Sequence, residues 1–326
     1  MRILQVAPNH ETVPPCRDGG TERIIYQLSE GLARRNHEVI LFAPQGSHFS
    51  GTVIPYPFYG DYSIGSYVME HLPQDIDIIH DHTFDSALSR TGAHFPLVHT
   101  LHLPVNNAVE FPIYVSHSAQ QVIGGGYGYY VHNGVEAESY EFSAEKDDYL
   151  LFMGRIVREK GIVEAMSLAE TTGRRLVIAG PLHDEGLYLN EMVPRLKRNP
   201  LMQYVGPVGG RIRHDLLKRA RCLLFPIQWE EPFGLVLLEA MACGTPVLAL
   251  SRGAVPEILY PFPEMSCDSL DQMTEKLLYY SPPYPPEQLR HHVQEQFSES
   301  KMIDGYLSLY QLAVSEYRSK GGIVDV

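Results

Sequence analysis

The chain has 326 residues, of which 44% are hydrophobic and 20% are charged, a composition typical of a folded globular protein. Four cysteines without paired spacing exclude a disulfide framework and a cysteine-rich zinc site. The 39 acidic and 26 basic residues give a formal net charge of −13, which disfavours acidic partners such as nucleic acid.

The acidity is strongest in the first part of the chain. Residues 1–140 contain six arginines, no lysine and 14 acidic residues, a balance of −8. Docking on an anionic membrane is therefore disfavoured, and no stretch approaches the roughly 20 apolar residues of a spanning helix. Since the N-terminal apolar run is also too short for a signal peptide, we expect a soluble, cytoplasmic protein.

Apolar runs alternate with segments of helical spacing from the N-terminus onward. Residues 21–35 predict a helix with Thr21 as its N-cap, whereas residues 44–76 show little periodicity and are interpreted mainly as loop. Strands separated by crossover segments favour a parallel sheet. The predicted strands of this part are residues 3–7, 39–43, 77–80, 97–101 and 112–116.

The same alternation restarts after a polar stretch at residues 133–148, which we interpret as a linker. We therefore predict an α/β protein with an N-terminal domain of residues 1–140, a second domain of residues 141–296 and a terminal helical segment of residues 297–326. Ligands of two facing parallel sheets bind at the carboxyl ends of the strands. The strands predicted for the second domain are residues 149–153, 175–179, 202–205, 222–225 and 247–250.

The most informative stretch is FPIQWEEPFGLVLLE, residues 225–239. A proline and a glycine break the backbone just before a predicted helix, so the amides of Phe233, Gly234 and Leu235 are expected to form an anion site for a diphosphate. Glu231 and Glu239 flank this point, and carboxylates accept hydrogen bonds from sugar hydroxyls. The alternative is a helix cap followed by a buried ion pair.

Two further loops carry residue types suited to phosphate. Arg155 and Lys160 lie in GRIVREKG, directly after a predicted strand, where two cations could neutralise a diphosphate leaving group; solvated surface charges are the alternative. Gly19 and Gly20 precede the first helix and allow close approach of a phosphate, although such pairs are often only turns.

Together these motifs resemble the retaining GT-B glycosyltransferases, and more specifically glycosyl transferases group 1, family 4. The resemblance is carried by G-R-x(4)-K-G, by E-P-F-G-x(4)-E-A-M-A-C-G-T-P-V, by a later Gly followed by Glu, and by LVHTLH, VSHS and HNGV. It implies the GT-B architecture, in which two Rossmann-like domains face a cleft and a C-terminal helix crosses back to the first domain. It does not extend to residues 44–76, where the acceptor is expected.

The resemblance also implies roles for individual residues. Glu231 would bind the donor sugar and Glu239 the ribose, while His102 would contact the sugar near the reacting centre. The diphosphate would be bound by Arg155 and Lys160, the amides of Phe233, Gly234 and Leu235, and the Gly19–Gly20 turn. Val208 would lie beside the base, and Gly253 and Glu257 fit the final Gly…Glu element, for which a helix-start turn is an equal alternative. No cofactor and no metal are implied.

Some patterns are interpreted as lookalikes. Asp75 and Asp77 form a D-x-D pattern, but they lead into an apolar strand and are expected to be structural. His80, Asp81 and His82 have residue types that bind metals, yet lining the site or capping the strand is favoured, with His82 as a candidate acceptor contact.

The function predicted from this resemblance is retaining, metal-independent transfer of a hexose, with a UDP-linked donor favoured over a GDP-linked one. The acceptor is expected to be a soluble molecule with a hydroxyl group. Two alternatives stay open, a sugar-nucleotide 2-epimerase of related fold and a non-catalytic nucleotide-sugar-binding protein. A dinucleotide-dependent oxidoreductase is disfavoured because GGGYG at residues 124–128 lacks the G-x-G-x-x-G spacing.

Overall fold

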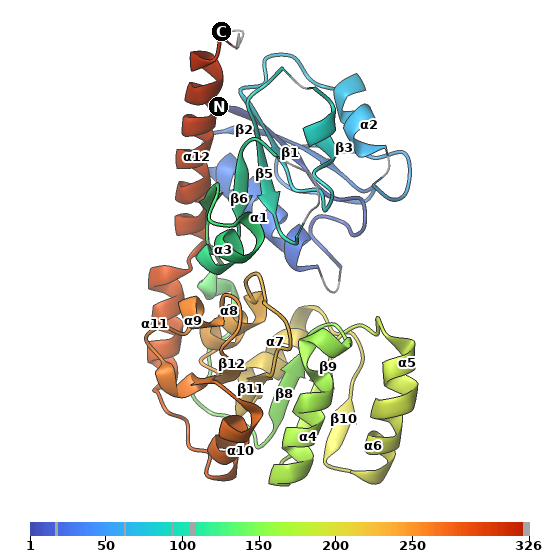
Figure 1. The fold of residues 1–326 in the computed structure, drawn as a ribbon, viewed down its shortest axis with the longest axis vertical. Coiled ribbons are helices and arrows are strands. Elements are labelled where there is room, and N and C mark those ends of the chain that lie inside the picture. Colours follow the sequence, from blue (N-terminus) through green and yellow to red (C-terminus); the bar gives the residue numbers. More distant parts are fainter. Residues whose placement is uncertain (17–18, 62, 93, 105–108, 322–326) are drawn as a thin grey trace. The chain divides into compact units, whose positions relative to one another are not determined.

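The computed structural model describes residues 1–16, 19–61, 63–92, 94–104 and 109–321 (Figure 1). The chain forms two compact α/β units. Unit 1 comprises Met1–Gly134 together with Glu299–Val326, and unit 2 comprises Val135–Ser298. The first division lies six residues before the predicted boundary at residue 140, and the second lies two residues after the predicted start of the C-terminal segment.

Unit 1 is built on a parallel sheet with the strand order β3-β2-β1-β4-β5-β6-β7. The order reverses beside β1, which pairs with both β2 and β4, and this reversal is the hallmark of a doubly wound Rossmann-like sheet. Its central strands are buried along most of their length, as their apolar runs predicted. The strands are β1 (Arg2–Val6), β2 (Glu38–Ala43), β3 (Thr52–Pro55), β4 (Ile78–Asp81), β5 (Leu97–Leu101), β6 (Pro112–Tyr114) and β7 (Tyr129–Tyr130).

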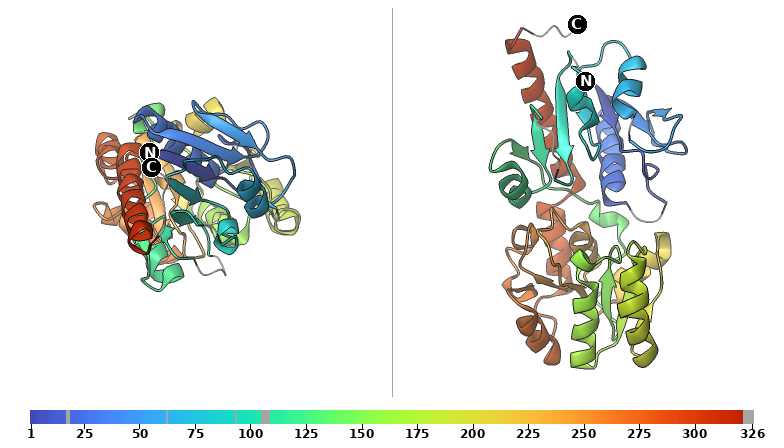
Figure 2. Two further views of the ribbon diagram at one scale, coloured as in Figure 1. Left: turned by 90° about the horizontal axis from the view of Figure 1, so that it is seen from above. Right: turned by 45° about the vertical axis from the view of Figure 1, so that its right-hand side comes forward.

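Helices α1 (Gly20–Arg34), α2 (Ile64–Glu70) and α3 (His117–Gly124) connect these strands. The last helix of the chain, α12 (Glu299–Ser319), also belongs to unit 1: it packs beside α1 and β5 and runs alongside the sheet (Figure 2, right-hand view). Tyr306 and Tyr310 of α12 are fully buried. The C-terminal helix is therefore part of the unit 1 core.

Most of the described residues of 44–76 are loop, as predicted, but the stretch also contains one strand and one helix that the sequence did not predict. Strand β3 pairs in parallel with β2, and helix α2 lies in the same stretch. Ile64 and Val68 of α2 are buried in a cluster with Tyr56. The sequence signal was weak because the strand has four residues and the helix has only two buried positions, too few to establish a period.

Unit 2 has the strand order β10-β9-β8-β11-β12-β13, again parallel, and it reverses beside β8. Helix α4 (Ile162–Thr172) packs beside α10 (Leu270–Leu278), and α8 (Leu235–Ala242) packs beside α11 (Pro286–Gln296). The strands are β8 (Leu150–Met153), β9 (Leu176–Ala179), β10 (Met202–Tyr204), β11 (Cys222–Phe225), β12 (Val247–Leu250) and β13 (Ser266–Cys267). The other helices are α5 (Glu185–Leu187), α6 (Val193–Arg198), α7 (Gly210–Arg219) and α9 (Val255–Ile258).

Both units are α/β with parallel sheets, which confirms the predicted fold class. None of the helices in the described parts of the chain is long and apolar enough to span a membrane.

Candidate functional site

The carboxyl ends of β8 and β11 lie side by side at the point where the strand order of unit 2 reverses. Ligands of doubly wound sheets bind at such a switch point. The loop after β8 carries Arg155 and Lys160, and the loop after β11 carries Trp229 and Glu231. The chain therefore brings together residues 71 positions apart at the expected edge of the sheet.

Lys160, Trp229 and Glu231 form a hydrogen-bonded cluster. The Lys160 Nζ donates to Glu231 Oε2 over 2.6 Å, and the Trp229 Nε1 donates to the same oxygen over 2.8 Å. Lys160 Nζ also lies 5.0 Å from the centre of the indole ring, within cation–π distance. The side chains of Lys160 and Glu231 are 16% and 10% exposed. Glu231 is thus held in one orientation by two donors.

The second carboxylate oxygen of Glu231, Oε1, accepts no hydrogen bond from any residue that the structure describes. An ionised carboxylate has lone pairs on both oxygens, so Oε1 can accept a hydrogen bond from a ligand hydroxyl. From sequence, Trp229 is expected to be an aromatic of the core or rim, with packing beside the donor as the alternative. Its contribution as the N–H donor that orients Glu231 was missed.

The backbone around Glu231 is fixed by Gly253. Gly253 has a φ of +57°, and a Cβ placed there would lie 2.2 Å from the carbonyl oxygen of Glu231. The Ala254 amide donates to that same carbonyl over 2.9 Å. The sequence element Gly253…Glu257 therefore requires glycine at its first position, because the loop that carries Glu231 occupies the space that a side chain of residue 253 would need. Glu257 itself lies in the short helix α9.

A second glycine joins the two loops. Gly161 has a φ of +80°, and a Cβ there would lie 1.9 Å from the carbonyl oxygen of Pro226. Next to it, the Gln228 amide donates to the Glu159 carbonyl over 2.8 Å. The loops after β8 and β11 therefore touch backbone to backbone, and this contact sets the spacing between Lys160 and Glu231.

Arg155 lies in the same loop, half-buried. Its guanidinium forms no ion pair with a carboxylate among the residues described. Helix α8 begins at Leu235, with Gly234 at the N-cap in the left-handed region (φ +96°), and Phe233 is buried. In the described portion of the chain the amides of Gly234 and Leu235 have no hydrogen-bond acceptor, as predicted for a helix N-terminus that binds an anion.

Glu239 was expected to lie open to a ligand and to accept hydrogen bonds from hydroxyl groups, but the structure shows otherwise. It is fully buried on α8, forms an ion pair with Arg213 of α7, and accepts a hydrogen bond from the Tyr140 hydroxyl over 3.2 Å. The buried ion pair considered as the alternative is therefore present. Arg213 was missed because it lies 26 residues before Glu239 and carries no local signal. Val208, half-buried, lies in the loop between β10 and α7.

In unit 1, Gly19 and Gly20 lie at the start of α1, but Thr21 is not its N-cap. The helix begins at Gly20 with Gly19 as the cap residue, and among the residues that the structure describes no side chain caps it. The reason is geometric: Gly19 has a φ of +143°, and a Cβ there would lie 2.8 Å from Glu22 Oε2 and from Pro15. The backbone at Gly19 therefore has a conformation that favours glycine.

His82 and His102 follow the neighbouring strands β4 and β5. His82 Nδ1 lies 3.1 Å from His102 Nε2, and His82 Nε2 lies 2.7 Å from Gln5 Oε1. His82 is fully buried with both ring nitrogens bonded, so the predicted acceptor contact is corrected: His82 supports His102 instead. Burial lowers the pKa of His102 to about 4 and lowers the pKa of His82 well below its ordinary value, so both rings are neutral at pH 7.

The residues with metal-binding side chains near β4 have other partners. His80 is hydrogen-bonded to Tyr310 and Thr100, and Asp81 accepts from Thr83 and from the Leu88 amide. Within the described ranges no three His, Cys, Asp or Glu side chains are placed to hold a metal ion. In the D-x-D pattern, Asp77 accepts from the Arg2 amide at the amino end of the sheet, which fits the structural interpretation.

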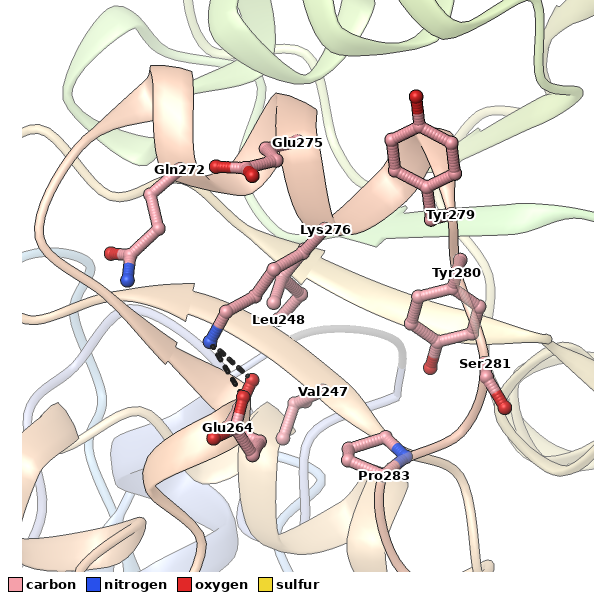
Figure 3. A pocket seen from close by; sticks show the side chains of 10 residues that line it. All are labelled: Val247, Leu248, Glu264, Gln272, Glu275, Lys276, Tyr279, Tyr280, Ser281 and Pro283. Atoms are coloured by element: carbon pink, nitrogen blue, oxygen red, sulfur yellow. Dashed lines mark hydrogen bonds and ion pairs between the residues drawn. The ribbon is translucent and has the colours of Figure 1, made fainter.

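A pocket of about 420 Å³ lies elsewhere in unit 2 (Figure 3). It is lined by Val247 at the amino end of β12 and by Lys276, which is bonded to Glu264. Because ligands of parallel sheets bind at the carboxyl ends, this pocket lies at the wrong edge for the candidate site. The residues predicted to bind a nucleotide sugar in unit 2, such as Arg155, Lys160 and Glu231, lie instead on the loops after β8 and β11.

Two family models match the chain. Residues 136–262 match the family described as Glycosyl transferases group 1, and residues 18–138 match Glycosyltransferase Family 4.

Among curated relatives, an uncharacterized glycosyltransferase of Methanocaldococcus jannaschii is 37% identical over 119 residues, covering 35% of this chain and 30% of the relative. Phosphatidyl-myo-inositol mannosyltransferase of Mycobacterium tuberculosis is 24% identical over 310 residues, covering 79% of this chain and 80% of the relative. This chain therefore spans under a third of the first relative and four fifths of the second.

Solved structures extend the likeness to nearly the whole chain. AviGT4, a glycosyltransferase of avilamycin A biosynthesis, has a TM-score of 0.79 and 26% identity, covering 96% of this chain and 98% of that one. HepE of Anabaena, solved in complex with UDP and glucose, has a TM-score of 0.75 and 16% identity, covering 96% of this chain and all of that one. At that identity HepE shows the fold alone.

Proposed function

Since the chain belongs to the GT-B glycosyltransferases, we propose that it transfers a hexose from a nucleotide-diphosphate sugar to an acceptor hydroxyl with retention of configuration. The observation that carries this proposal is the Lys160–Trp229–Glu231 cluster at the switch point of unit 2. It places a cation and an oriented carboxylate together, next to a helix N-terminus. A nucleotide sugar needs both, one for its diphosphate and one for its hydroxyls.

The proposed donor contacts follow from the chemistry of each group. Glu231 Oε1 accepts from a sugar hydroxyl, because Oε2 is already occupied by Lys160 and Trp229. The guanidinium of Arg155 and the amides of Gly234 and Leu235 bind the diphosphate. Phe233 and Val208 keep their proposed donor-side roles, whereas the fully buried Glu239 is paired with Arg213. The roles of Gly19, Gly20 and His102 in unit 1 stay predictions.

The chemical step leaves negative charge on the departing diphosphate. Positioned cations and helix amides that meet charge as it develops supply a large part of the stabilisation of such a transition state. Lys160 is held by Glu231 before substrate binds, so little reorganisation is needed. We propose same-face attack, in which the leaving phosphate accepts the proton of the acceptor hydroxyl. With two side-chain cations available, the proposed reaction needs no metal.

We propose UDP as the nucleotide, which the UDP complex of the fold neighbour HepE supports. For the acceptor we propose a soluble molecule, because residues 1–140 carry a balance of −8 and no lysine. The mannosyltransferase relative is named for a phospholipid headgroup, so a lipid acceptor is the rival. Co-sedimentation with anionic liposomes at low salt separates the two, since strong binding would contradict the charge argument.

The function is tested by proton NMR of the protein with UDP- and GDP-hexoses, first without and then with a panel of acceptors and without added metal. We expect slow release of free α-hexose from one UDP-linked donor and faster transfer once an acceptor is added. An isomerised nucleotide sugar would show an epimerase instead. Donor binding without any conversion across the acceptor panel would show a non-catalytic binder.

Variants of the loop after β8 test the cation roles. Lys160→Ala and Arg155→Ala should each lower turnover by roughly 100-fold, the order of loss seen when one transition-state donor is removed. Affinity for the nucleoside should change much less. Arg158→Ala is the matched control, since Arg158 lies in the same loop but is exposed and paired with Glu191. If all three variants kept full turnover, the cation assignment would be wrong.

A further inference from the structure

Unit 1 contains a continuous chain of buried side-chain hydrogen bonds that ends at His102. Its members come from three strands, the ends of those strands and helix α12, and each except His102 is at most 1% exposed. The links are 2.6 to 3.1 Å long. In order, the members are His102, His82, Gln5, Tyr310, His80, Thr100 and Tyr306.

The amide of Gln5 sets the direction of this chain. Its Oε1 can only accept, so the His82 Nε2, 2.7 Å away, carries the hydrogen. A neutral imidazole has one N–H, so His82 Nδ1 is an acceptor, and the hydrogen bond at 3.1 Å comes from His102 Nε2–H. His102 is then left with a bare Nδ1.

The hydrogen bonds that run from Gln5 through Tyr310 to Tyr306 are consistent with this orientation of the Gln5 amide. Gln5 Nε2 can only donate, so the Tyr310 hydroxyl accepts from it over 3.0 Å and gives its own hydrogen to His80 Nδ1 over 2.6 Å. His80 Nε2–H then donates to Thr100, which donates to Tyr306. Burial lowers the pKa of His80 and His82 well below the ordinary value, so each ring has one hydrogen to place. Each link fixes the next.

We propose that Gln5 and Tyr310 are positioning residues that hold His102 as the Nε2–H tautomer, so that its Nδ1 is presented as a hydrogen-bond acceptor to a substrate hydroxyl. Nδ1 has no partner among the residues that the structure describes. A bare imidazole nitrogen accepts from an O–H and repels a phosphate oxygen, which has no hydrogen to give. That Nδ1 binds a substrate hydroxyl rests on the proposed function. The assignment of the Nε2–H tautomer to His102 does not depend on that function.

The direction of these hydrogen bonds matters because the same atoms can also be hydrogen-bonded in the opposite direction. If the Gln5 amide were turned over, every hydrogen would reverse, and His102 would present Nδ1–H as a donor. The two states make opposite demands on the ligand. The hydrogen-bonded chain therefore decides whether His102 Nδ1 accepts a hydrogen bond from a hydroxyl or donates one to a phosphate or hydroxyl oxygen.

The first test is ¹⁵N NMR of the histidine-labelled full chain at pH 7 without ligand, with assignment by single histidine variants. We expect His80, His82 and His102 as neutral Nε2–H tautomers. An Nδ1–H tautomer at His102 would overturn the proposal. This measurement requires no enzymatic activity, so it fails independently of the proposed function.

The second test removes one link with Tyr310→Phe, which preserves the aromatic ring. The His102 ¹⁵N shifts should move toward values averaged between the tautomers, and kcat/KM for the donor should fall roughly five-fold, the equivalent of about one hydrogen bond. Tyr56→Phe is the control: it loses a buried hydroxyl of the same unit that donates to the Ala7 carbonyl and lies outside the chain of hydrogen bonds. If Tyr310→Phe left the His102 spectrum like that of Tyr56→Phe, the positioning role would be refuted.

Discussion

Replacing Arg213 by methionine tests whether Glu239 depends on its buried ion pair. The Glu239 side chain is 0% exposed and that of Arg213 is 11% exposed, so water cannot take the place of the guanidinium. Removing one partner of such a pair leaves an uncompensated buried charge, which costs about 3–5 kcal/mol. That is a large part of the ~5–15 kcal/mol by which proteins are stable. For a unit of this size it corresponds to a decrease in Tm of roughly 6–20 °C.

The assay is thermal and urea unfolding followed by circular dichroism. Arg211→Met is the matched control, because Arg211 lies on the same helix with its side chain 91% exposed and its i,i+4 pair with Asp215 is worth under about 0.5 kcal/mol. Adding Glu239→Gln to Arg213→Met should restore at least half of the lost stability, since a neutral amide needs no counter-charge. The reasoning is refuted if Arg213→Met is no less stable than Arg211→Met, or if the double variant recovers nothing.

Three further outcomes are expected. Gly253→Ala should lower activity and destabilise the protein by about 1–3 kcal/mol, because its Cβ would lie 2.2 Å from the Glu231 carbonyl at a φ of +57°; full activity with an unchanged urea midpoint would contradict this. Burial lowers the pKa of His102 to about 4, so between pH 6.5 and pH 4 this histidine is protonated in the unfolded state but stays neutral in the folded state. The urea midpoint should therefore be lower at pH 5 than at pH 7. A midpoint that does not change with pH would contradict the lowered pKa of His102. Titration with a thiol reagent should find one fast thiol, Cys16, because the other three cysteines are buried and burial raises their pKa to about 11 or 12; two or more fast thiols in the folded protein would be inconsistent with that burial.

The regular part of the fold could be predicted from sequence because its signals are local. Strands such as Leu97–Leu101 and Cys222–Phe225 are short apolar runs buried on both faces, and their predicted bounds are confirmed. The start of helix α8 was predicted because Pro232 and Gly234 lie directly before it. In contrast, the short β3 and α2 of residues 44–76 offer no period, and their place is decided by packing against β2.

The candidate site was predictable only in part, for the same reason. The charged residues and the glycines of the two loops indicated that they could bind a ligand. The structure brings Lys160 and Glu231 of these loops into contact. Their partners could not be found this way. Arg213 pairs across 26 residues, and Gln5 bonds to Tyr310 across 305, so no window of sequence contains both members. Such contacts exist only once a unit has folded.

The membership of α12 in unit 1 has a consequence for biosynthesis. Unit 1 is discontinuous: its sheet is complete by residue 130, but Tyr306 and Tyr310, which fill its core, are made only after all of unit 2. Domains usually complete folding in the order in which the ribosome delivers them. Here the order is inverted. Unit 2 possesses all of its residues at Ser298, while the first-made sheet must wait for the last helix, exposed meanwhile to chaperones and proteases.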